Sequence, residues 1–482
     1  MLIKELNTLE PQARRLEPSP DARASSRRAV LNYTEQFLDD IDRLSAFNEY
    51  ASETKQSAEL DISESPIDLD NAIKIIGEHV DKPGLNPASG GHLGYIPGGG
   101  IYFSALGDYM AAVTNRYAGI RFTGPGAVAL EHALVRWMAK LVGYPATAAG
   151  NLTSGGSIAN LCAIVAARDA SGLKAADWHR AVIYTTEHAH HCLDKAYRIA
   201  GLGEAVRRVI PMDERFRMDT AALERSVEVD RREGLRPFLV VGNAGSTDVG
   251  AIDPLDRIAE IAKQNKLWFH IDAAYGGFFI LTDEGREKLR GIEKSDSVVM
   301  DPHKGLFLPY GLGTVLVRER AHLKHSHQYS AAYMQDAAGA DEDSPADLSP
   351  ELTKHFRGLR LWLPLKLHGI APFRACLQEK LLLARYAYEQ LMQMSGFEVL
   401  NEPELSVVAY RYVPKSGDAN AFNKRIQAAV QKDGRVFISS TTIRGTVYLR
   451  LAILAFRTHL NTIQLALEIL KEKVSELEGS RQ

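Results

Sequence analysis

Apolar positions in the first part of the chain recur every three to four residues, which is the spacing of amphipathic helices. One such series runs from Arg28 to Phe47, and Ser65-Pro66 opens a second, where the proline suits a first helical turn. Residues 1–25 are polar and are expected to be loosely ordered. The pattern therefore predicts that residues 1–83 form a helical N-terminal arm.

After residue 84 the pattern changes, and short uninterrupted apolar runs alternate with helix-like stretches. Such runs are typical of strands that are buried on both faces in a mostly parallel sheet. We therefore predict that residues 84–371 form a large α/β domain around such a sheet. The runs cover residues 181–184, 238–241, 267–270, 298–300 and 311–317.

Two further regions depart from this alternation. The C-terminal part begins with a long helical stretch near 372–394 and then mixes strand-like with helix-like segments, so residues 372–482 are predicted to form a smaller α/β domain. Residues 334–350 are small, acidic and contain proline. They predict a long polar loop, and long loops in compact domains are usually functional or disordered.

Composition excludes several classes of protein. The chain has 482 residues, of which 45% are hydrophobic and 24% charged, as in ordinary globular proteins. Its net charge of −3 gives no reason to expect nucleic acid or a membrane as a partner. Three cysteines are too few for a disulfide framework, and the N-terminus lacks the apolar stretch of a signal peptide. Because no apolar run approaches ~18 residues, the expected location is the cytoplasm.

Two of the strand-like runs end in residues that carry chemistry. The run 267–270 leads into Asp272, and the run 298–300 leads into Asp301-Pro302-His303-Lys304. A pyridoxal phosphate (PLP) enzyme needs a lysine that bonds the cofactor aldehyde and a carboxylate that keeps the pyridine nitrogen protonated. Lys304 and Asp272 are candidates for these two roles. The alternative is a core aspartate and a surface lysine in an ordinary α/β domain.

The two segments also resemble a known family. His-Ile-Asp-Ala-Ala-Tyr-Gly-Gly at 270–277, followed by Asp-Pro-His-Lys at 301–304, is similar to the group II PLP-dependent amino-acid decarboxylases. The resemblance is greatest to the aromatic-L-amino-acid branch and runs from about Gly90 to Leu363, then more weakly to the C-terminus. It implies a fold type I (aspartate-aminotransferase-like) enzyme. It also implies a homodimer with shared active sites, in which the arm of each chain packs across its partner.

A glycine-rich turn marks a possible anion site. Thr153-Ser154-Gly155-Gly156-Ser157 precedes a strongly helical stretch, and the free N–H groups of a helix N-terminus attract a phosphate. A plain helix cap is the alternative, but the resemblance implies that Gly156 and Ser157 contact the cofactor phosphate. Neither GxGxxG nor GxxxxGK(S/T) occurs, so nucleotide binding is not expected.

Three histidines follow the run 181–184, a position where the sites of α/β proteins gather. The resemblance aligns Ala189-His190 with the family's Ala-His and implies that His190 stacks on the cofactor ring and assists at the reacting carbon. His188 and His191 stay open for this role. The competing interpretation is a metal site, since three histidines lie within four residues, but no HExxH or CxxC motif accompanies them.

The resemblance implies three further cofactor contacts. Thr247 falls where the family touches the cofactor. Ala274 is expected beneath the ring face opposite His190, where a larger side chain would not fit. His303 is expected at the phosphate, with a neutral core histidine as the alternative.

The segment from Lys324 to Gln328, with Tyr333 downstream, is similar to the family's mobile loop. That loop carries a tyrosine that returns a proton to the substrate carbon after CO2 leaves. Tyr333 is our candidate, Tyr329 stays open, and an exposed tyrosine on a flexible loop is the alternative. Because the aldehyde-forming branch commonly has phenylalanine at this position, a tyrosine favours simple decarboxylation.

Three residues depart from the family pattern on or near the expected substrate side. Asp301 replaces a common asparagine, so a direct phosphate contact is not carried over to it. Gly305 stands where many aromatic decarboxylases have tryptophan, and Gly98 ends a stretch similar to the family's Tyr-Phe-Pro-Thr. These changes leave the cofactor chemistry intact and the substrate open.

The combined prediction is a PLP-dependent carboxy-lyase that converts an L-amino acid, with an aromatic one favoured, to its amine and CO2. Glutamate, aspartate and diaminobutyrate stay open as substrates. The nearest rivals keep the fold and act as a PLP lyase, a sulfinate decarboxylase or an aldehyde synthase. A zinc hydrolase built on the histidines and a protein that kept the fold but lost activity are more distant alternatives.

Overall fold

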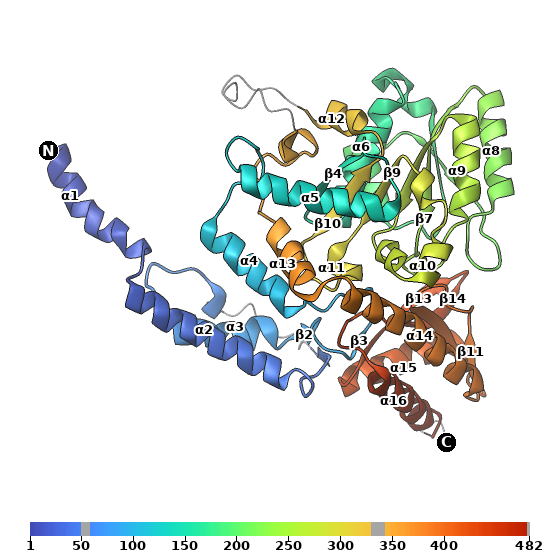
Figure 1. The fold of residues 1–482 in the computed structure, drawn as a ribbon. Helices are drawn as coiled ribbons and strands as arrows, with labels where there is room; N and C mark the ends of the chain where they lie inside the picture. Colours follow the sequence, from blue (N-terminus) through green and yellow to red (C-terminus); the bar gives the residue numbers. More distant parts are fainter. Residues whose placement is uncertain (50–57, 329–342, 480–482) are drawn as a thin grey trace.

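The large domain is built around a seven-stranded sheet. The computed structural model describes residues 1–49, 58–328 and 343–479. Figure 1 shows this domain above a smaller one, with a helical arm extending to the left. The strand order is β4-β10-β9-β8-β7-β5-β6, and only the pairs made by β10 are antiparallel, which confirms the predicted mostly parallel sheet. Its strands are β4 (Ala149–Thr153), β5 (Ala181–Thr185), β6 (Val206–Val209), β7 (Arg236–Asn243), β8 (Trp268–Asp272), β9 (Ser297–Met300) and β10 (Gly313–Val317).

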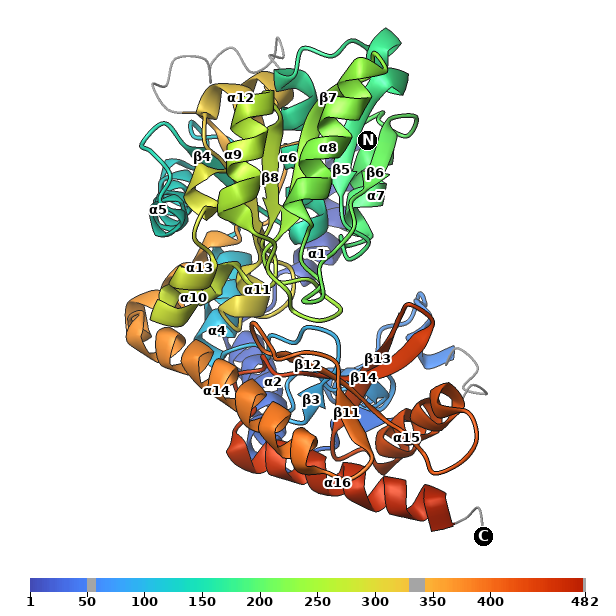
Figure 2. The same cartoon turned by 90° about the vertical axis from the view of Figure 1, so that its right-hand side faces the viewer.

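Side chains of these strands alternate between two cores, because successive residues of a strand point to opposite faces. Val182 and Tyr184 of β5 pack with helices α5, α8 and α9, whereas Ala181 and Ile183 pack with α6, α7 and α12. Helices thus cover both faces of the sheet, and Figure 2 shows α8 and α9 lying over one of them. The helices of this domain are α5 (Pro125–Val142), α6 (Gly156–Ala170), α7 (Cys192–Ile199), α8 (Thr220–Arg232), α9 (Leu255–Asn265), α10 (Asp283–Lys288), α11 (Pro302–Gly305), α12 (Arg320–His327) and α13 (Gly358–His368).

The smaller domain contains a five-stranded sheet in the order β11-β12-β14-β13-β3. Its edge strand β3 comes from residues 92–93, within the stretch that the sequence assigns to the large domain, so this segment joins the two domains. The division at residues 83 and 371 stays a prediction. The elements are β3 (His92–Leu93), α14 (Ala371–Gln393), β11 (Phe397–Val399), β12 (Val407–Tyr412), α15 (Ala419–Asp433), β13 (Phe437–Ile443), β14 (Thr446–Ala452) and α16 (Leu460–Gly479).

The structure of the N-terminal arm differs from the sequence prediction in two respects. Residues 1–25 are not loosely ordered, since α1 covers Leu2–Ala13 and α2 covers Pro20–Asp40. Helix α2 begins early because Ser19 Oγ accepts a hydrogen bond from the Ala22 N–H at 3.2 Å. The next helix, α3 (Leu69–Ile76), begins after Asp68 rather than at Ser65-Pro66, since the Asp68 carboxylate caps it. The remaining elements are β1 (Phe47–Asn48), β2 (Gly84–Leu85) and α4 (Tyr102–Thr114).

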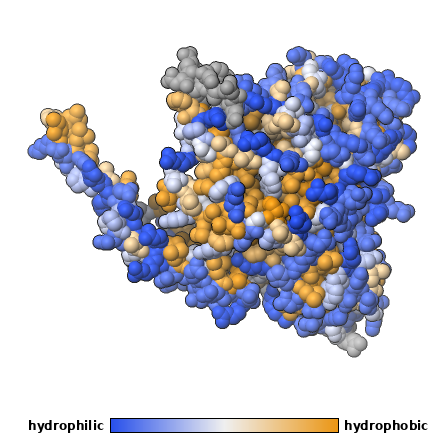
Figure 3. Space-filling view, in the orientation of Figure 1, coloured by the Kyte–Doolittle hydropathy of each residue, from blue (hydrophilic) through white to orange (hydrophobic). Residues whose placement is uncertain are grey.

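Apolar side chains stay exposed on the arm and on α4. Helix α1 has no buried residue, and Figure 3 shows hydrophobic residues at the free end of the arm and in the middle of the face in view. Large exposed apolar patches mark contact surfaces. Across the described ranges, no helix combines the length and the apolar character that a bilayer span requires. The exposed residues include Leu2, Ile3, Leu6 and Leu9 of α1 and Tyr109, Met110 and Val113 of α4.

Candidate active site

The carboxyl ends of β5, β7, β8 and β9 meet the N-terminus of α6 around a cavity of about 450 Å³. Sites of open α/β sheets gather at this edge. The structure brings together every cofactor-contacting residue that the sequence predicts, although the individual roles stay predictions. The residues that line the cavity include Gly156, Ser157, His190, Thr247, Asp272, Ala274, His303 and Lys304.

Asp272 is the last residue of β8, and its carboxylate is held by two N–H donors. Oδ1 accepts a hydrogen bond from the Ala274 N–H at 3.1 Å, and Oδ2 accepts one from the Asn160 side chain at 3.3 Å. The carboxylate is nearly buried, with 8% of the residue exposed. Both oxygens therefore have a partner, and the orientation of the carboxylate toward the cavity is fixed.

Behind Asp272 lies a buried chain of hydrogen bonds that the sequence analysis missed. Trp268 donates from Nε1 to Ser297 Oγ, Ser297 donates to His270 Nδ1, and His270 donates from Nε2 to Asn160 Oδ1, over distances of 2.8, 2.8 and 2.7 Å. In this assignment Trp268 only donates, whereas Ser297, His270 and Asn160 each donate one hydrogen bond and accept another. Burial lowers the pKa of His270 to about 4, so the ring is neutral with its proton on Nε2.

One sequence signal could have revealed this chain. Asn160 is the only amide among the otherwise apolar residues at the start of the helical stretch 158–167. A fully buried polar side chain in a helix must find partners, and here it finds His270 and Asp272.

Lys304 lies in the short helix α11 that follows β9. Its Nζ is 3.3 Å from Oδ2 of Asp301, and its side chain keeps 24% of its surface exposed. Since Lys304 also lines the cavity, the amine is held at the wall while still open to a ligand. Asp301, by contrast, is almost completely buried.

His188, His190 and His191, which follow β5, have different surroundings. His190 lines the cavity, its Nδ1 accepts a hydrogen bond from the Cys192 N–H at 3.2 Å, and burial lowers its pKa. His188 also lines the cavity, but its ring stacks on Phe216 at 5.6 Å. His191 is exposed. Within residues 1–49, 58–328 and 343–479, no three His, Cys, Asp or Glu side chains are arranged to hold a metal, so the zinc interpretation gains no support.

The other end of the cavity is formed by the first turn of α6 and by His303. Gly155 precedes the helix, and Gly156 and Ser157 are its first residues, so their N–H groups have no helical partner. His303 bonds the Leu312 carbonyl through Nδ1, and burial lowers its pKa. Uncommitted N–H groups at a helix N-terminus attract an anion, in agreement with the predicted phosphate position.

The smaller domain reaches this site through Arg450 of β14, which the sequence analysis also missed. Its guanidinium donates to the backbone carbonyls of Thr247 and of Asp248, the latter at 2.9 Å. Thr441 donates to the Asp248 carboxylate at 2.6 Å. The loop that carries Thr247 is thus held from the smaller domain.

Packing explains two departures from the family pattern. A Cβ atom at Gly98 would lie 2.0 Å from the carbonyl oxygen of His303, so a threonine does not fit there. A Cβ atom at Gly305 would lie 2.8 Å from the Phe278 side chain. Both glycines therefore allow a close approach at the base of the lysine segment.

The first part of the expected loop segment is helical. Lys324 to His327 form the last turn of α12, which is fixed by the buried Leu323 and by an ion pair of 2.6 Å between Lys324 and Asp343. Residues 345–347 form a short 3-10 helix with a capping box, so the predicted loop 334–350 is ordered at this end. Tyr329 and Tyr333 lie outside the described residues.

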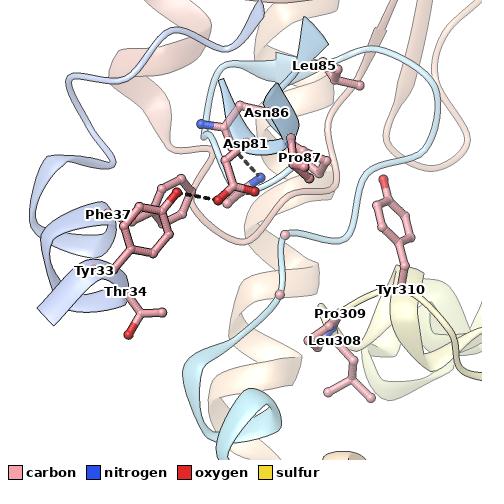
Figure 4. Close-up of a pocket in the computed structure, with 14 residues that line it drawn as sticks. Tyr33, Thr34, Phe37, Asp81, Leu85, Asn86, Pro87, Leu308, Pro309 and Tyr310 are labelled. Atoms are coloured by element: carbon pink, nitrogen blue, oxygen red, sulfur yellow. Dashed lines mark hydrogen bonds between the residues drawn. The ribbon is translucent and has the colours of Figure 1, made fainter. Parts of the chain in front are cut away.

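A second pocket, of about 400 Å³, adjoins the cavity and shares Tyr310 with it. Figure 4 shows its wall, with Tyr33 and Phe37 of α2 facing Asp81, and with Pro309 and Tyr310 on the other side. The Tyr33 hydroxyl donates to the Asp81 carboxylate at 2.6 Å. Burial, with this bond, raises the pKa of Tyr33 to about 12.

The donor set of the cavity fits PLP. In the described part of the chain Asp272 has no cationic partner, so its oriented carboxylate can accept a hydrogen bond from a protonated pyridine nitrogen. Lys304 presents an amine to the same space, and the N-terminus of α6 presents free N–H groups. These are the three functions that PLP requires from a protein.

Comparison with known proteins gives a consistent picture. A family model described as the pyridoxal-dependent decarboxylase conserved domain matches residues 60–413. An aromatic-L-amino-acid decarboxylase of Bacillus atrophaeus is 31% identical over 406 residues, which is 82% of this chain and 83% of the relative. An L-2,4-diaminobutyrate decarboxylase of Rhizobium meliloti is 31% identical, over 77% of this chain and 75% of that relative.

A solved structure supports the fold. The crystal structure of Oryza sativa TDC with PLP and tryptamine superposes with a TM-score of 0.90 at 24% sequence identity, covering 96% of this chain and 99% of the other. At this level of identity the similarity speaks for the fold type alone, and it confirms the predicted fold type I architecture.

Proposed function

Since this chain belongs to the pyridoxal-dependent decarboxylase family, we propose that it removes CO2 from an aromatic L-amino acid and releases the amine. The carboxy-lyase class and the PLP cofactor follow from the family match. The observation that carries the proposal is the pairing of Asp272, held by neutral donors, with Lys304 in one cavity.

Each residue has a task in this reaction. PLP, when bound, supplies a ring that accepts the electron pair left behind by CO2. Lys304 would hold the cofactor through its amine. Asp272 holds the proton at the pyridine nitrogen, and Asn160 keeps its carboxylate oriented. His190, kept neutral by burial, assists at the reacting carbon.

The amine is proposed as the product, rather than an aldehyde, because of Tyr333. A hydroxyl at this position can return a proton to the substrate carbon, whereas a phenylalanine cannot. This role rests on the resemblance of the sequence alone.

The adjoining pocket supports an aromatic substrate. Because Tyr310 borders both spaces, a substrate whose amino group lies at Lys304 can extend its side chain into the second pocket. The rings of Tyr33 and Phe37 and the ring of Pro309 line that pocket. Flat aromatic side chains gain a large buried area against such rings.

One observation favours a second substrate, diaminobutyrate. Asp81 lines the same pocket, and a carboxylate there could bind a side-chain ammonium group. The bond from the Tyr33 hydroxyl to Asp81 satisfies part of its hydrogen-bonding capacity, which makes the aromatic substrate the better supported of the two.

We propose further that two copies of this chain form a dimer. Helix α1 has no buried residue, and α4 exposes Tyr109, Met110 and Val113. A second copy covering these residues would remove their apolar surface from water.

The experiment that tests these proposals is a substrate screen. The protein, supplied with PLP, is given the twenty standard amino acids and diaminobutyrate, and CO2 and the organic product are measured. We expect the highest kcat/KM for an aromatic amino acid, an amine as product and a particle of twice the chain mass in light scattering. A higher kcat/KM for diaminobutyrate, glutamate or aspartate would refute the substrate, and an aldehyde would refute the product.

A further inference from the structure

Asp301 is a buried carboxylate that the proposed reaction does not use. Its side chain is 2% exposed, and its Oδ2 lies 3.3 Å from Lys304 Nζ and 3.8 Å from His303 Nε2. Its Oδ1 is buried and has no hydrogen-bond partner among the residues that the structure describes. An unpartnered buried oxygen of this kind calls for an explanation.

The position of Asp301 connects it to the phosphate end of the cavity. A Cβ atom at Gly156 would lie 2.7 Å from Oδ2, and a Cβ atom at Gly313 would lie 2.7 Å from Oδ1. The carboxylate is therefore packed against the first residue of α6. A phosphate attracted to the N–H groups of Gly156 and Ser157 would meet acceptor oxygens there, not the N–H donors of an amide.

Contact between the Asp301 carboxylate and a phosphate is unfavourable unless a proton lies between them. The second pKa of a phosphate monoester is about 6, so near pH 8 the free cofactor carries a dianionic phosphate. A dianion and a carboxylate at contact distance in a buried site repel each other strongly. One proton between them converts the repulsion into a charge-assisted hydrogen bond.

We propose that Asp301 couples cofactor binding to the uptake of one proton, which is held between the Asp301 carboxyl group and the cofactor phosphate. The proton comes from solvent, and one O–H bond forms, on either the carboxyl or the phosphate oxygen. The inference rests on the PLP cofactor and not on the proposed substrate.

Other groups near Asp301 limit where this proton can reside. Lys304 offsets part of the negative charge in the free protein, but its amine is the group that bonds the cofactor. His303 is the main competitor, since its Nδ1 bonds the Leu312 carbonyl and its Nε2 is left to face the carboxylate. Other titratable or charged groups near this region, among the residues that the structure describes, are His190 and Cys192 after β5, Asp272 of β8, Tyr310 and Arg360 of α13.

The test compares the wild-type chain with Asp301→Asn, a variant of equal size that has no charge to repel the phosphate. Full-length protein is freed of cofactor, and the Kd for PLP is measured by absorbance from pH 6 to pH 8.5. Pyridoxal, which has a hydroxyl in place of the phosphate, is measured in parallel. In the wild type, we expect the Kd for PLP relative to that for pyridoxal to rise by roughly tenfold per pH unit above pH 6.5. In Asp301→Asn this ratio should be flat and PLP should bind more tightly at pH 8.

Three results would overturn the proposal. If the ratio in the wild type does not depend on pH, no extra proton is bound. An equal pH dependence in Asp301→Asn would place the proton elsewhere, with His303 the first site to test. A variant that binds PLP and pyridoxal equally poorly would show that Asp301 serves only as the counter-ion of Lys304.

A measurement on the wild type alone covers the case in which the variant does not fold. Calorimetric titrations in two buffers of different ionisation enthalpy count the protons taken up on binding. We expect one more proton for PLP than for pyridoxal at pH 8, and an equal number would contradict the proposal. Neither measurement requires turnover, so its outcome is independent of the substrate screen.

Discussion

Asp272 and Asp301 are both buried carboxylates at the ends of neighbouring parallel strands, yet their surroundings differ. Asp272 receives N–H donors on both oxygens, from Ala274 and Asn160. Asp301 has a lysine near one oxygen and no hydrogen-bond partner for the other among the described residues. One carboxylate is thus oriented by neutral groups, and the other is balanced by a charge.

The difference shows that partners, more than burial, decide what a buried carboxylate can do. A carboxylate with donors on both oxygens is stabilised in its charged form and in one orientation, which is what a pyridine nitrogen needs to stay protonated. A carboxylate with an unpartnered oxygen can still accept a proton when a second anion arrives. Asp272 is therefore expected to keep a proton on the ring nitrogen, whereas Asp301 is expected to take up a proton together with the phosphate.

The largest expected effect comes from removing the negative charge of Asp272, which is expected to face the cofactor ring. We expect Asp272→Asn to lower kcat by at least ~100-fold, since an amide does not hold the ring nitrogen protonated and each ~1.4 kcal/mol of transition-state stabilisation is a factor of ten. Steady-state CO2 release at saturating PLP measures the effect. Asp272→Glu, which keeps the charge, should lose less.

Asp230→Asn is the matched control, because Asp230 on α8 is also buried and bonds Tyr184 and Arg208, which are not among the residues that line the cavity. It should lower stability but leave kcat near the wild-type value. Near-normal turnover in Asp272→Asn would remove the proposed role of this residue. An equal fall in kcat in Asp301→Asn would show that the two carboxylates do not differ in function.

A second prediction uses the neutral histidine behind Asp272. Burial lowers the pKa of His270 to about 4, against ~6.5 in the unfolded chain. Between these values the unfolded chain binds a proton that the folded chain does not, so stability is full above pH 6.5 and is lost as the pH falls toward 4. For this one group the loss from pH 7 to pH 4.5 is roughly 2–3 kcal/mol.

Glutamine at position 270 can keep a donor toward Asn160 and does not titrate. Wild type should therefore lose roughly 2–3 kcal/mol more than His270→Gln over this range, measured by denaturant unfolding at each pH. His92→Gln is the control outside the cavity, since burial also lowers the pKa of His92 to about 4, and it should show a similar difference. Parallel curves for wild type and His270→Gln would contradict the assignment of a neutral ring.

Much of the fold could be predicted from the chain because buried strands carry uninterrupted apolar runs. Each of the five strand-like runs lies within two residues of one observed strand, in chain order β5, β7, β8, β9 and β10. The two edge strands β4 and β6 were not predicted, because β4 contains a glycine and an asparagine and β6 contains two arginines instead of an apolar run. Asn151 in β4 donates to the Pro345 carbonyl, a long-range contact that no local pattern reveals.

The residues of the site also fall into those that the sequence predicts and those that it does not. Lys304, Asp272 and the α6 turn could be found because they occur in local motifs next to strand ends. The sequence marks Asn160 only as a polar residue in an apolar helix, and the roles of Asn160 and Arg450 could not be assigned from it, because their partners lie more than a hundred residues away. Local sequence thus predicted groups that line the cavity, and the fold was needed for the groups that hold them.

The smallest expected effect tests Asn160, which connects the histidine chain to the ring-end carboxylate. Asn160→Ala leaves Asp272 with the Ala274 N–H alone, so the carboxylate is less firmly oriented. We expect kcat to fall about tenfold, or ~1.4 kcal/mol, with KM little changed, and the absorbance of the bound cofactor to vary with pH differently from wild type. Asn423→Ala is the matched control, since Asn423 is another fully buried asparagine, bonded to Tyr412 in the smaller domain. Both variants should lose about 1–3 kcal/mol of stability. If Asn160→Ala and Asn423→Ala also had the same kcat and the same cofactor spectrum, Asn160 would be a packing residue. The orientation of Asp272 would then depend on the Ala274 N–H.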